Sequence, residues 1–266
     1  MQTQTPSSSP RRVYVAWQDT ATRQWHTIAR LSLVGDRYEF SFTRGAEKLR
    51  NVVKQLFNSS LDDNYVSSEL ISVFRNKIPP RRRSDFHKLA NWLNLRGDEP
   101  DFELLGKFGL IPGSDGLLVY SEPRVERGRY SIEFFIHGIR HAHGDLGNHH
   151  LHGDVMTWCQ AAHEGDRLYP LLDVQNESDV NAVGLRAPEG TIIVGYVPRF
   201  YTRDLRLILG QPEFASTAEF RLVRNNHDAP LQFRMLCRFM SNVPDDFKAL
   251  DDADREMRPT LAPFAD

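Results

Sequence analysis

The chain has 266 residues, of which 40% are hydrophobic and 26% charged, so it can bury one sizeable core or two modest ones. No apolar run approaches the roughly 20 residues of a membrane span, and Cys159 and Cys237 are too few for a disulfide framework or an all-cysteine zinc site. The formal net charge of -2 argues against purely electrostatic coating of nucleic acid. We therefore expect a cytoplasmic protein of two domains with no membrane partner.

The first half of the chain predicts an α+β domain over residues 13–127, preceded by a flexible polar tail at 1–12. Strand signals come first, with β-branched and aromatic residues enriched at 13–19 and 26–43. Apolar residues at helical spacing follow in four segments: 45–58, 67–80, 84–95 and 101–109. The run Arg81–Arg83 opposes the macrodipole of the helix expected after it, which leaves either a solvated surface or an anionic partner as its explanation.

The second half predicts a smaller β-rich domain over residues 128–240, with one short helix, an added C-terminal hairpin and an acidic tail at 241–266. Alternation in LQFRMLCRF, residues 231–239, is typical of a half-buried strand. The helix is expected to start at Thr202 as its cap. Charge shifts between the halves, since residues 1–127 hold 19 basic and 15 acidic side chains whereas 128–210 hold 7 and 10.

A series of short motifs in the second half resembles the HIRAN family, over roughly residues 130–210. In chain order the motifs are GIRH (138–141), GD (165–166) before an apolar strand, NESDVNAV (176–183), and VGYVPR (194–199) before a short helix. The resemblance implies an OB-like β-barrel. It also implies a grip on the 3′ end of single-stranded DNA, which is the family's role in eukaryotic remodeller-type proteins, whereas bacterial members are often free-standing.

The resemblance also implies a set of nucleic-acid-binding residues. Arginines suit phosphates, aromatic rings suit a terminal base, and a carboxylate accepts from a free terminal hydroxyl. The family's functional positions fall on these residues: Arg140, His141, Asn176, Ser178, Asp179, Tyr196 and Arg199.

One sequence difference from the DNA-gripping members affects this assignment of binding residues. Where DNA-gripping members have Pro-Tyr, this chain has Glu177-Ser178, which removes a stacking surface worth about 1 to 3 kcal/mol and adds a negative charge near the phosphate path. Asp179 and Asn181 also have a purely structural explanation, because they can close a tight Asx-type turn. The two roles are compatible.

A second resemblance covers roughly residues 60–123. LISVFRNKIPP, SDFHKL, DFELLGKFG and GSDGLLVYSEP are similar to the N-terminal region of HipA-type proteins. The kinase lobe of that family is not found in the remaining residues. The resemblance therefore implies an interaction or regulatory module that would bind a protein partner through the first half of the chain.

The stretch HGIRHAHGDLGNHHLHGD, residues 137–154, raises the question of a metal site. His141, His143 and Asp145 resemble the H-x-H-x-D string of zinc hydrolases, to which Cys159 and His163 would add ligands if the segment folded back. The final histidine of that string is Leu146 here. Because glycines and polar residues dominate, we favour a long polar loop after a first barrel strand, with no metal and no cofactor.

Three functional hypotheses follow. The first is a non-enzymatic protein that binds single-stranded DNA or its 3′ end, in a setting such as genome defence or DNA-damage processing. The second is a protein-interaction or regulatory module of toxin-antitoxin type, and the third is a zinc-dependent hydrolase. The sequence ranks them in that order and leaves open DNA versus RNA, the protein partner and the oligomeric state.

Overall fold

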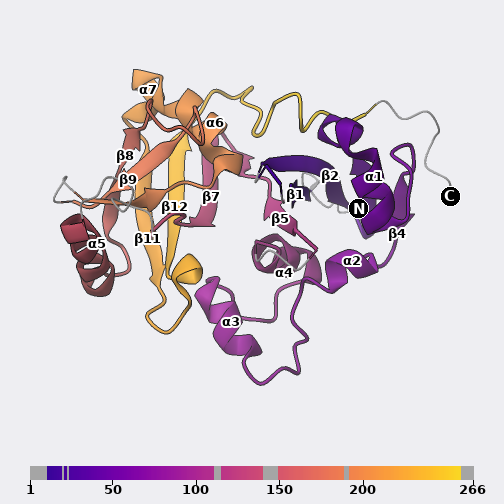
Figure 1. Ribbon diagram of the computed structural model, residues 1–266, viewed down its shortest axis with the longest axis horizontal. Coiled ribbons are helices and arrows are strands. Elements are labelled where there is room, and N and C mark those ends of the chain that lie inside the picture. Colours follow the sequence, from indigo (N-terminus) through magenta and orange to yellow (C-terminus); the bar gives the residue numbers. More distant parts are fainter. Residues whose placement is uncertain are drawn as a thin grey trace, which may run out of the picture. The chain divides into compact units, whose positions relative to one another are not determined.

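The computed structural model describes residues 11–19, 21–22, 24–110, 115–139, 149–188 and 192–258. The fold is mixed α/β with two antiparallel sheets, one in each of two compact units (Figure 1). The first unit comprises Met1–Phe86, Gly97–Glu122 and Asp251–Asp266, and the second comprises His87–Arg96 and Pro123–Leu250. Each unit is thus assembled from segments that are separated in the sequence.

The sheet of the first unit has the strand order β4-β3-β2-β1-β5, with every neighbouring pair antiparallel. Gly35 takes a positive φ of 63° in the tight turn between the second and third strands, which divides the predicted strand segment 26–43 in two. The strands are β1 (Arg11–Gln18), β2 (Trp25–Val34), β3 (Arg37–Phe42), β4 (Tyr65–Ser67) and β5 (Leu117–Ser121).

Helices supply the rest of the first unit's core. The helix predicted at 45–58 is confirmed as a 3-10 helix followed by an α-helix, and the one at 101–109 is confirmed with Gly109 as its C-cap. The helix expected over 67–80 is reduced to four residues. Ser67 belongs to β4, and Pro79 and Pro80 prevent the helix from reaching the end of the predicted segment. The bounds are Arg44–Leu49 for the 3-10 helix, then α1 (Arg50–Phe57), α2 (Ser72–Arg75) and α4 (Asp101–Phe108).

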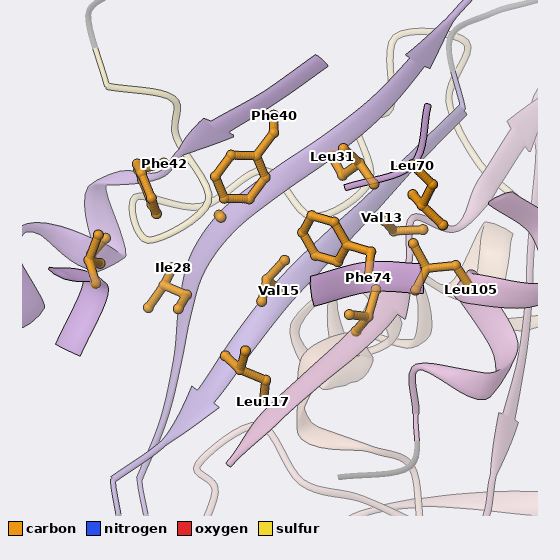
Figure 2. Close-up of a cluster of buried hydrophobic side chains, with 14 of the residues drawn as sticks. Val13, Val15, Ile28, Leu31, Phe40, Phe42, Leu70, Phe74, Leu105 and Leu117 are labelled. Carbon is orange, nitrogen blue, oxygen red and sulfur yellow. The ribbon is translucent and has the colours of Figure 1, made fainter. Parts of the chain in front are cut away.

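The core of the first unit centres on aromatic and branched side chains from the sheet and these helices (Figure 2). The Phe40 ring lies 5.5 Å from that of Phe57 and 5.6 Å from that of Phe74, measured between centroids. Val15 and Ile28 are fully buried beside them. Burial of this many apolar side chains is the main source of stability for a domain of this size.

The segment 251–258, which the sequence analysis assigned to an acidic tail of the second half, belongs to the first unit. The backbone N–H groups of Arg44 and Gly45 donate to the carbonyls of Glu256 and Asp254, at 2.9 and 3.0 Å. Arg255 places its Nε 2.8 Å from the buried Tyr120 hydroxyl. An arginine that is buried and hydrogen-bonded in this way fixes the segment in place.

Within the run Arg81–Arg83, two arginines have partners in the first unit. Arg81 donates to the carbonyl of Glu99 at 2.6 Å and pairs with the Asp101 carboxylate at 3.0 Å. Arg83 forms an ion pair with Asp85 at 2.5 Å. These contacts give Arg81 and Arg83 a structural explanation that needs no anionic partner.

The sheet of the second unit has the strand order β10-β9-β8-β11-β12-β7-β6 and is not the closed barrel that the sequence suggested. One isolated bridge joins the last residue of β10 to the chain just after β7, the strand next to the edge strand β6, through backbone hydrogen bonds of 2.9 and 2.8 Å between His137 and Tyr196. Gly138, with a φ of 72°, turns the chain directly after this bridge. The strands are β6 (Arg124–Glu126), β7 (Arg129–Phe135), β8 (Arg167–Leu172), β9 (Val183–Arg186), β10 (Ile193–Tyr196), β11 (Glu219–Asn225) and β12 (Met235–Asn242).

The expectation of one short helix in the second unit is wrong. Its helices are α3 (Phe86–Trp92, all but Phe86 in this unit), α5 (His149–Ala161), α6 (Arg199–Leu209) and α7 (Pro212–Ala215). Part of the predicted polar loop is α5, because Val155, Cys159 and Ala162 are buried at helical spacing behind the polar residues. The predicted strand at 231–239 starts at Met235, after a 3-10 turn over Leu231–Phe233.

Rings and one buried carboxylate hold the second unit together. Phe220 and Phe239 lie on neighbouring strands with centroids 4.5 Å apart, and Tyr130 meets Phe239 edge-on at 5.8 Å. The Tyr130 hydroxyl donates to the buried Asp204 carboxylate at 3.2 Å, and the Leu250 N–H donates to it at 2.9 Å. These bonds tie α6, which carries Asp204, to the sheet.

Candidate nucleic-acid interface

The candidate residues that the structure describes meet at one end of the second sheet. They come from three places: the loop 173–181 between β8 and β9, the last residue of β10, and the first residue of α6. Figure 1 shows α6 with α7 at one end of this unit. The loop, the strand end and the helix start converge because β9 pairs with both β8 and β10.

Asn176 organises the loop. Its Oδ1 accepts the backbone N–H groups of Ser178 and Asp179, both at 3.0 Å, and its Nδ2 donates to the Asp173 carboxylate at 3.2 Å. An Asx-type turn of this kind replaces missing backbone hydrogen bonds and fixes the path of a loop. Asn176 therefore positions Ser178 and Asp179 and is itself only partly exposed.

Asp179 has two structural partners. Its Oδ1 accepts the N–H of Asn181 at 2.9 Å, which is the tight turn that the sequence allowed for. Its Oδ2 accepts the hydroxyl of Thr202, also at 2.9 Å, which links the loop to α6. The sequence placed Thr202 at the helix cap, but α6 begins at Arg199 after Pro198, and Thr202 is buried one turn further on.

Tyr196 presents an aromatic ring at a fixed position. An added Cβ at Gly184 would lie 3.5 Å from Tyr196 Cε1, and one at Gly138 would lie 3.6 Å from Cδ2, so the ring packs over two glycines. Its hydroxyl donates to Asp173 Oδ2 at 3.1 Å. Burial, aided by the Asp173 carboxylate, raises the pKa of Tyr196, which keeps the hydroxyl protonated as a donor.

Close approach of two strands sets this arrangement. Gly195 has a φ of 150°, and an added Cβ there would lie 2.5 Å from the carbonyl oxygen of His137. A larger residue would therefore break the bridge between His137 and Tyr196. The glycine before Tyr196 is needed for this contact as well as for backbone freedom.

Arg199 is exposed at the start of α6, where its Nη2 donates to the Ser178 carbonyl at 3.3 Å. The first turn of α6 contains no acidic residue of its own, and the Asp179 carboxylate, which accepts from Thr202, offsets only part of the positive end of the helix dipole. A guanidinium at this position adds to that positive charge. The Arg199 guanidinium and the N-terminal end of α6 together favour binding of an anion at the edge of the loop.

Exposed side chains of the loop differ in character. Val174 and Val180 are 72% and 78% exposed, values that are high for valine, and they flank the polar turn. Glu177 and Ser178 are also exposed. The sequence reading missed the two valines, because nothing in a polar loop distinguishes an exposed apolar residue from a buried one.

Four of the sequence-predicted residues, Arg140, His141, His143 and Asp145, lie outside the described residues. Among those described, no group of three or more His, Cys, Asp or Glu side chains is arranged to hold a metal ion. Cys159 is buried with its Sγ 3.3 Å from Met235 Sδ, and burial raises its pKa to about 11. The metal site at His141 stays an untested hypothesis.

Comparisons with known proteins give distant likenesses. No family model and no curated protein matches the chain. A crystal structure of the HIRAN domain of human HLTF is 14% identical with a TM-score of 0.32, over 46% of this chain and 85% of that one. A protein from Lactobacillus plantarum is 11% identical with a TM-score of 0.30, over 43% of this chain and 97% of that one. At these values the likeness carries no argument about the site.

The HipA-type resemblance of residues 60–123 has no counterpart among these findings and stays a prediction. Within the ranges that the structure describes, no helix has the length and apolar character needed to cross a membrane.

Proposed function

We propose that this protein binds single-stranded DNA without catalysing a reaction, and that the loop 173–181, Tyr196 and Arg199 take its free 3′ end. The observation that carries the proposal is the exposed Arg199 guanidinium, which donates to the carbonyl of Ser178 next to Asp179, in a loop whose Asp173 also holds the Tyr196 hydroxyl. The HIRAN resemblance of the sequence supports the same ligand and adds Arg140 and His141. A setting in genome defence or DNA-damage processing belongs to this proposal.

Each group has a task in binding an end. Arg199 pairs with the last phosphodiester, and the Tyr196 ring stacks on the terminal base. The Asp179 oxygens each accept one internal hydrogen bond. Because a carboxylate offers about four acceptor positions, about two remain, and one of them can accept from the terminal 3′ hydroxyl. A phosphate on that hydroxyl would instead meet the negative charges of Asp179 and Glu177.

The loop compensates in part for the absence of a second aromatic residue. Val174 and Val180 offer apolar surface to bases or sugars, whereas Glu177 repels the backbone. Affinity then rests mainly on Tyr196 and the arginines. We expect binding that is weaker than that of a site with two stacking rings, by about 1 to 3 kcal/mol.

The test is fluorescence anisotropy with 5′-labelled single strands of about twelve nucleotides, a length suited to small barrel-like modules. Strands with a free 3′ hydroxyl are compared with strands carrying a 3′ phosphate. We expect preference for the free end, and a fall in affinity of about tenfold for Tyr196→Leu, which removes the ring. Tyr196→Phe keeps the ring and should lose much less.

A matched control is Arg37→Ala, which removes an exposed arginine from β3 in the first unit. It should bind like the wild type. Equal binding of both ends together with full affinity of Tyr196→Leu would refute the proposed end site.

A further inference from the structure

Strand register places three arginines side by side on one face of the second sheet. Arg221 on β11 is the direct partner of Arg167 on β8 and of Arg238 on β12. Directly opposed residues of antiparallel strands project to the same face. The three guanidiniums therefore form one row across three strands, next to each other in space but distant in sequence.

The neighbouring positions extend this row into a basic surface. Leu168, Phe220 and Phe239 are buried on one face of this sheet. The opposite face carries six arginines and three glutamates. We call it the arginine face, and its charged members are Arg124, Glu126, Arg129, Glu133, Arg167, Arg186, Glu219, Arg221 and Arg238. Six arginines against three glutamates give it a formal charge of +3, although the whole chain has a formal net charge of -2.

The glutamates offset only part of this charge. Glu219 pairs with Arg221 at 2.6 Å, and Glu133 accepts from Arg238 Nε at 2.8 Å. The hydrogen bond from Arg221 lowers the pKa of Glu219. Arg167 lies with its Cζ 5.3 Å from the centroid of the Tyr169 ring, and its charge contributes a smaller part of the lowered pKa of Glu219.

Opposed like charges destabilise a sheet, so an anion lying across the row would remove a cost that the free protein bears. The Tyr169 ring is 39% exposed and lies two residues from Arg167 on the same face. A ring next to a guanidinium suits a base and its phosphate together. An acidic peptide or a lipid headgroup would use the arginines but not the ring.

The arginine face leads to the proposed end site. Along β8, Arg167, Tyr169 and Leu171 alternate toward Asp173, which holds the Tyr196 hydroxyl. Leu171 is the partner of Gly184, over which the Tyr196 ring packs. At about 3.3 Å per residue the distance along the strand from Arg167 to Asp173 is about 20 Å, room for several nucleotides.

We propose that the arginine face binds the DNA strand that leads away from the bound 3′ end, with Tyr169 as a second stacking ring and Arg167 and Arg221 as phosphate partners. This inference rests on the proposed function, since it extends that site along the sheet. It predicts a binding energy that grows with strand length beyond the terminal nucleotides. It also assigns roles to three residues on which the family resemblance is silent.

The experiment measures affinity for single strands of about three and about twelve nucleotides, both with free 3′ ends, over a range of salt. For the long strand we expect Arg167→Ala and Arg221→Ala each to lower the slope of log K against log salt by about 0.7, the value for one phosphate contact. Tyr169→Leu should weaken the long strand by about fivefold or more. The three variants should leave the short strand unaffected, and Arg37→Ala should change neither.

Outcomes separate the two proposals. If the free end is preferred but the long strand gains nothing and the three variants bind it normally, the arginine face is refuted and the end site stands. If the variants weaken long strands while end preference is absent, the end site is refuted and the face still binds DNA. If neither the short nor the long strand binds, both proposals are refuted. If poly-glutamate competes as well as DNA does, the arginine face binds anions in general and the DNA proposal for it is refuted.

Discussion

The two units differ in what they leave exposed. In the first, the sheet and helices bury a cluster of aromatic and branched side chains, and the described arginines of segment 251–258 find internal partners. In the second, an arginine-rich sheet face and a loop with apolar tips remain exposed. Among the described residues, seven large hydrophobic side chains are exposed. Val34 and Tyr65 belong to the first unit, and five belong to the second: Tyr169, Leu172, Val174, Val180 and Leu207.

This difference separates stability from recognition. Apolar side chains that face water do not stabilise the free protein. Their concentration beside exposed arginines therefore indicates a binding surface. The described part of the first unit exposes two such side chains, Val34 and Tyr65, of which Val34 is the strand partner of the exposed Arg37, against five in the second unit. Substitutions in the first unit should therefore change folding, and those on the second unit's surface should change binding.

The largest effect is expected from the first unit's core. Phe40→Ala removes a ring that contacts Phe57 and Phe74 and should lower the free energy of unfolding by about 3 to 5 kcal/mol. Chemical denaturation measures this loss. The surface variant Tyr169→Leu serves as the contrast and should lower the free energy of unfolding by less than about 1 kcal/mol. Similar losses for the two variants would break the division between the units.

A smaller effect concerns Tyr14, which is buried in the first unit and stacks on Tyr120 at 5.6 Å. Burial, with a contribution from Glu122, raises its pKa from 10.0 to about 12. The unfolded chain thus loses this proton at lower pH than the folded one, so stability is complete below pH 10 and falls as pH rises toward 12. The loss is about 2 to 3 kcal/mol.

The control for this prediction is Tyr14→Phe, which keeps the ring and removes the ionisable hydroxyl. Denaturation of both proteins between about pH 9 and pH 12 isolates the contribution of Tyr14 from that of other groups. Parallel curves for the two proteins would contradict the account.

The smallest effect is expected at Glu177, an exposed residue of the loop 173–181. Glu177→Gln removes a negative charge beside the proposed phosphate path and should raise affinity for single-stranded DNA about two- to threefold, an effect that salt reduces. The free energy of unfolding should not change. Weaker binding by this variant would mean that the phosphates do not pass this loop.

Much of the first unit could be predicted from sequence, because local patterns decided it. Alternating apolar residues placed the strands at 13–43, and helical spacing placed the helices at 45–58 and 101–109. The closed barrel was not predictable in the same way, because closure depends on pairing between distant strands. Among the described residues, a single bridge connects β10 to the chain after β7. Helix α5 was missed because glycines and histidines masked its few buried positions.

The candidate site shows the same limit. The Asx turn at Asp179 could be foreseen from the residue types, since Asp and Asn side chains bond to backbone two residues on. The link from Asp179 to Thr202 and the row Arg167, Arg221 and Arg238 required the pairing of distant segments. Counting charges along the sequence could not reveal this basic surface, because its arginines become neighbours only through the pairing of the strands.

The central claim is that a DNA end binds in the second unit at Tyr196 and the loop 173–181. Photo-cross-linking with a 3′-terminal 4-thiothymidine, followed by mass spectrometry of the cross-linked peptides, tests it most directly. The account predicts cross-links to Tyr196 or to residues 173–181, which a 3′ phosphate on the probe suppresses. Cross-links confined to the first unit would contradict it.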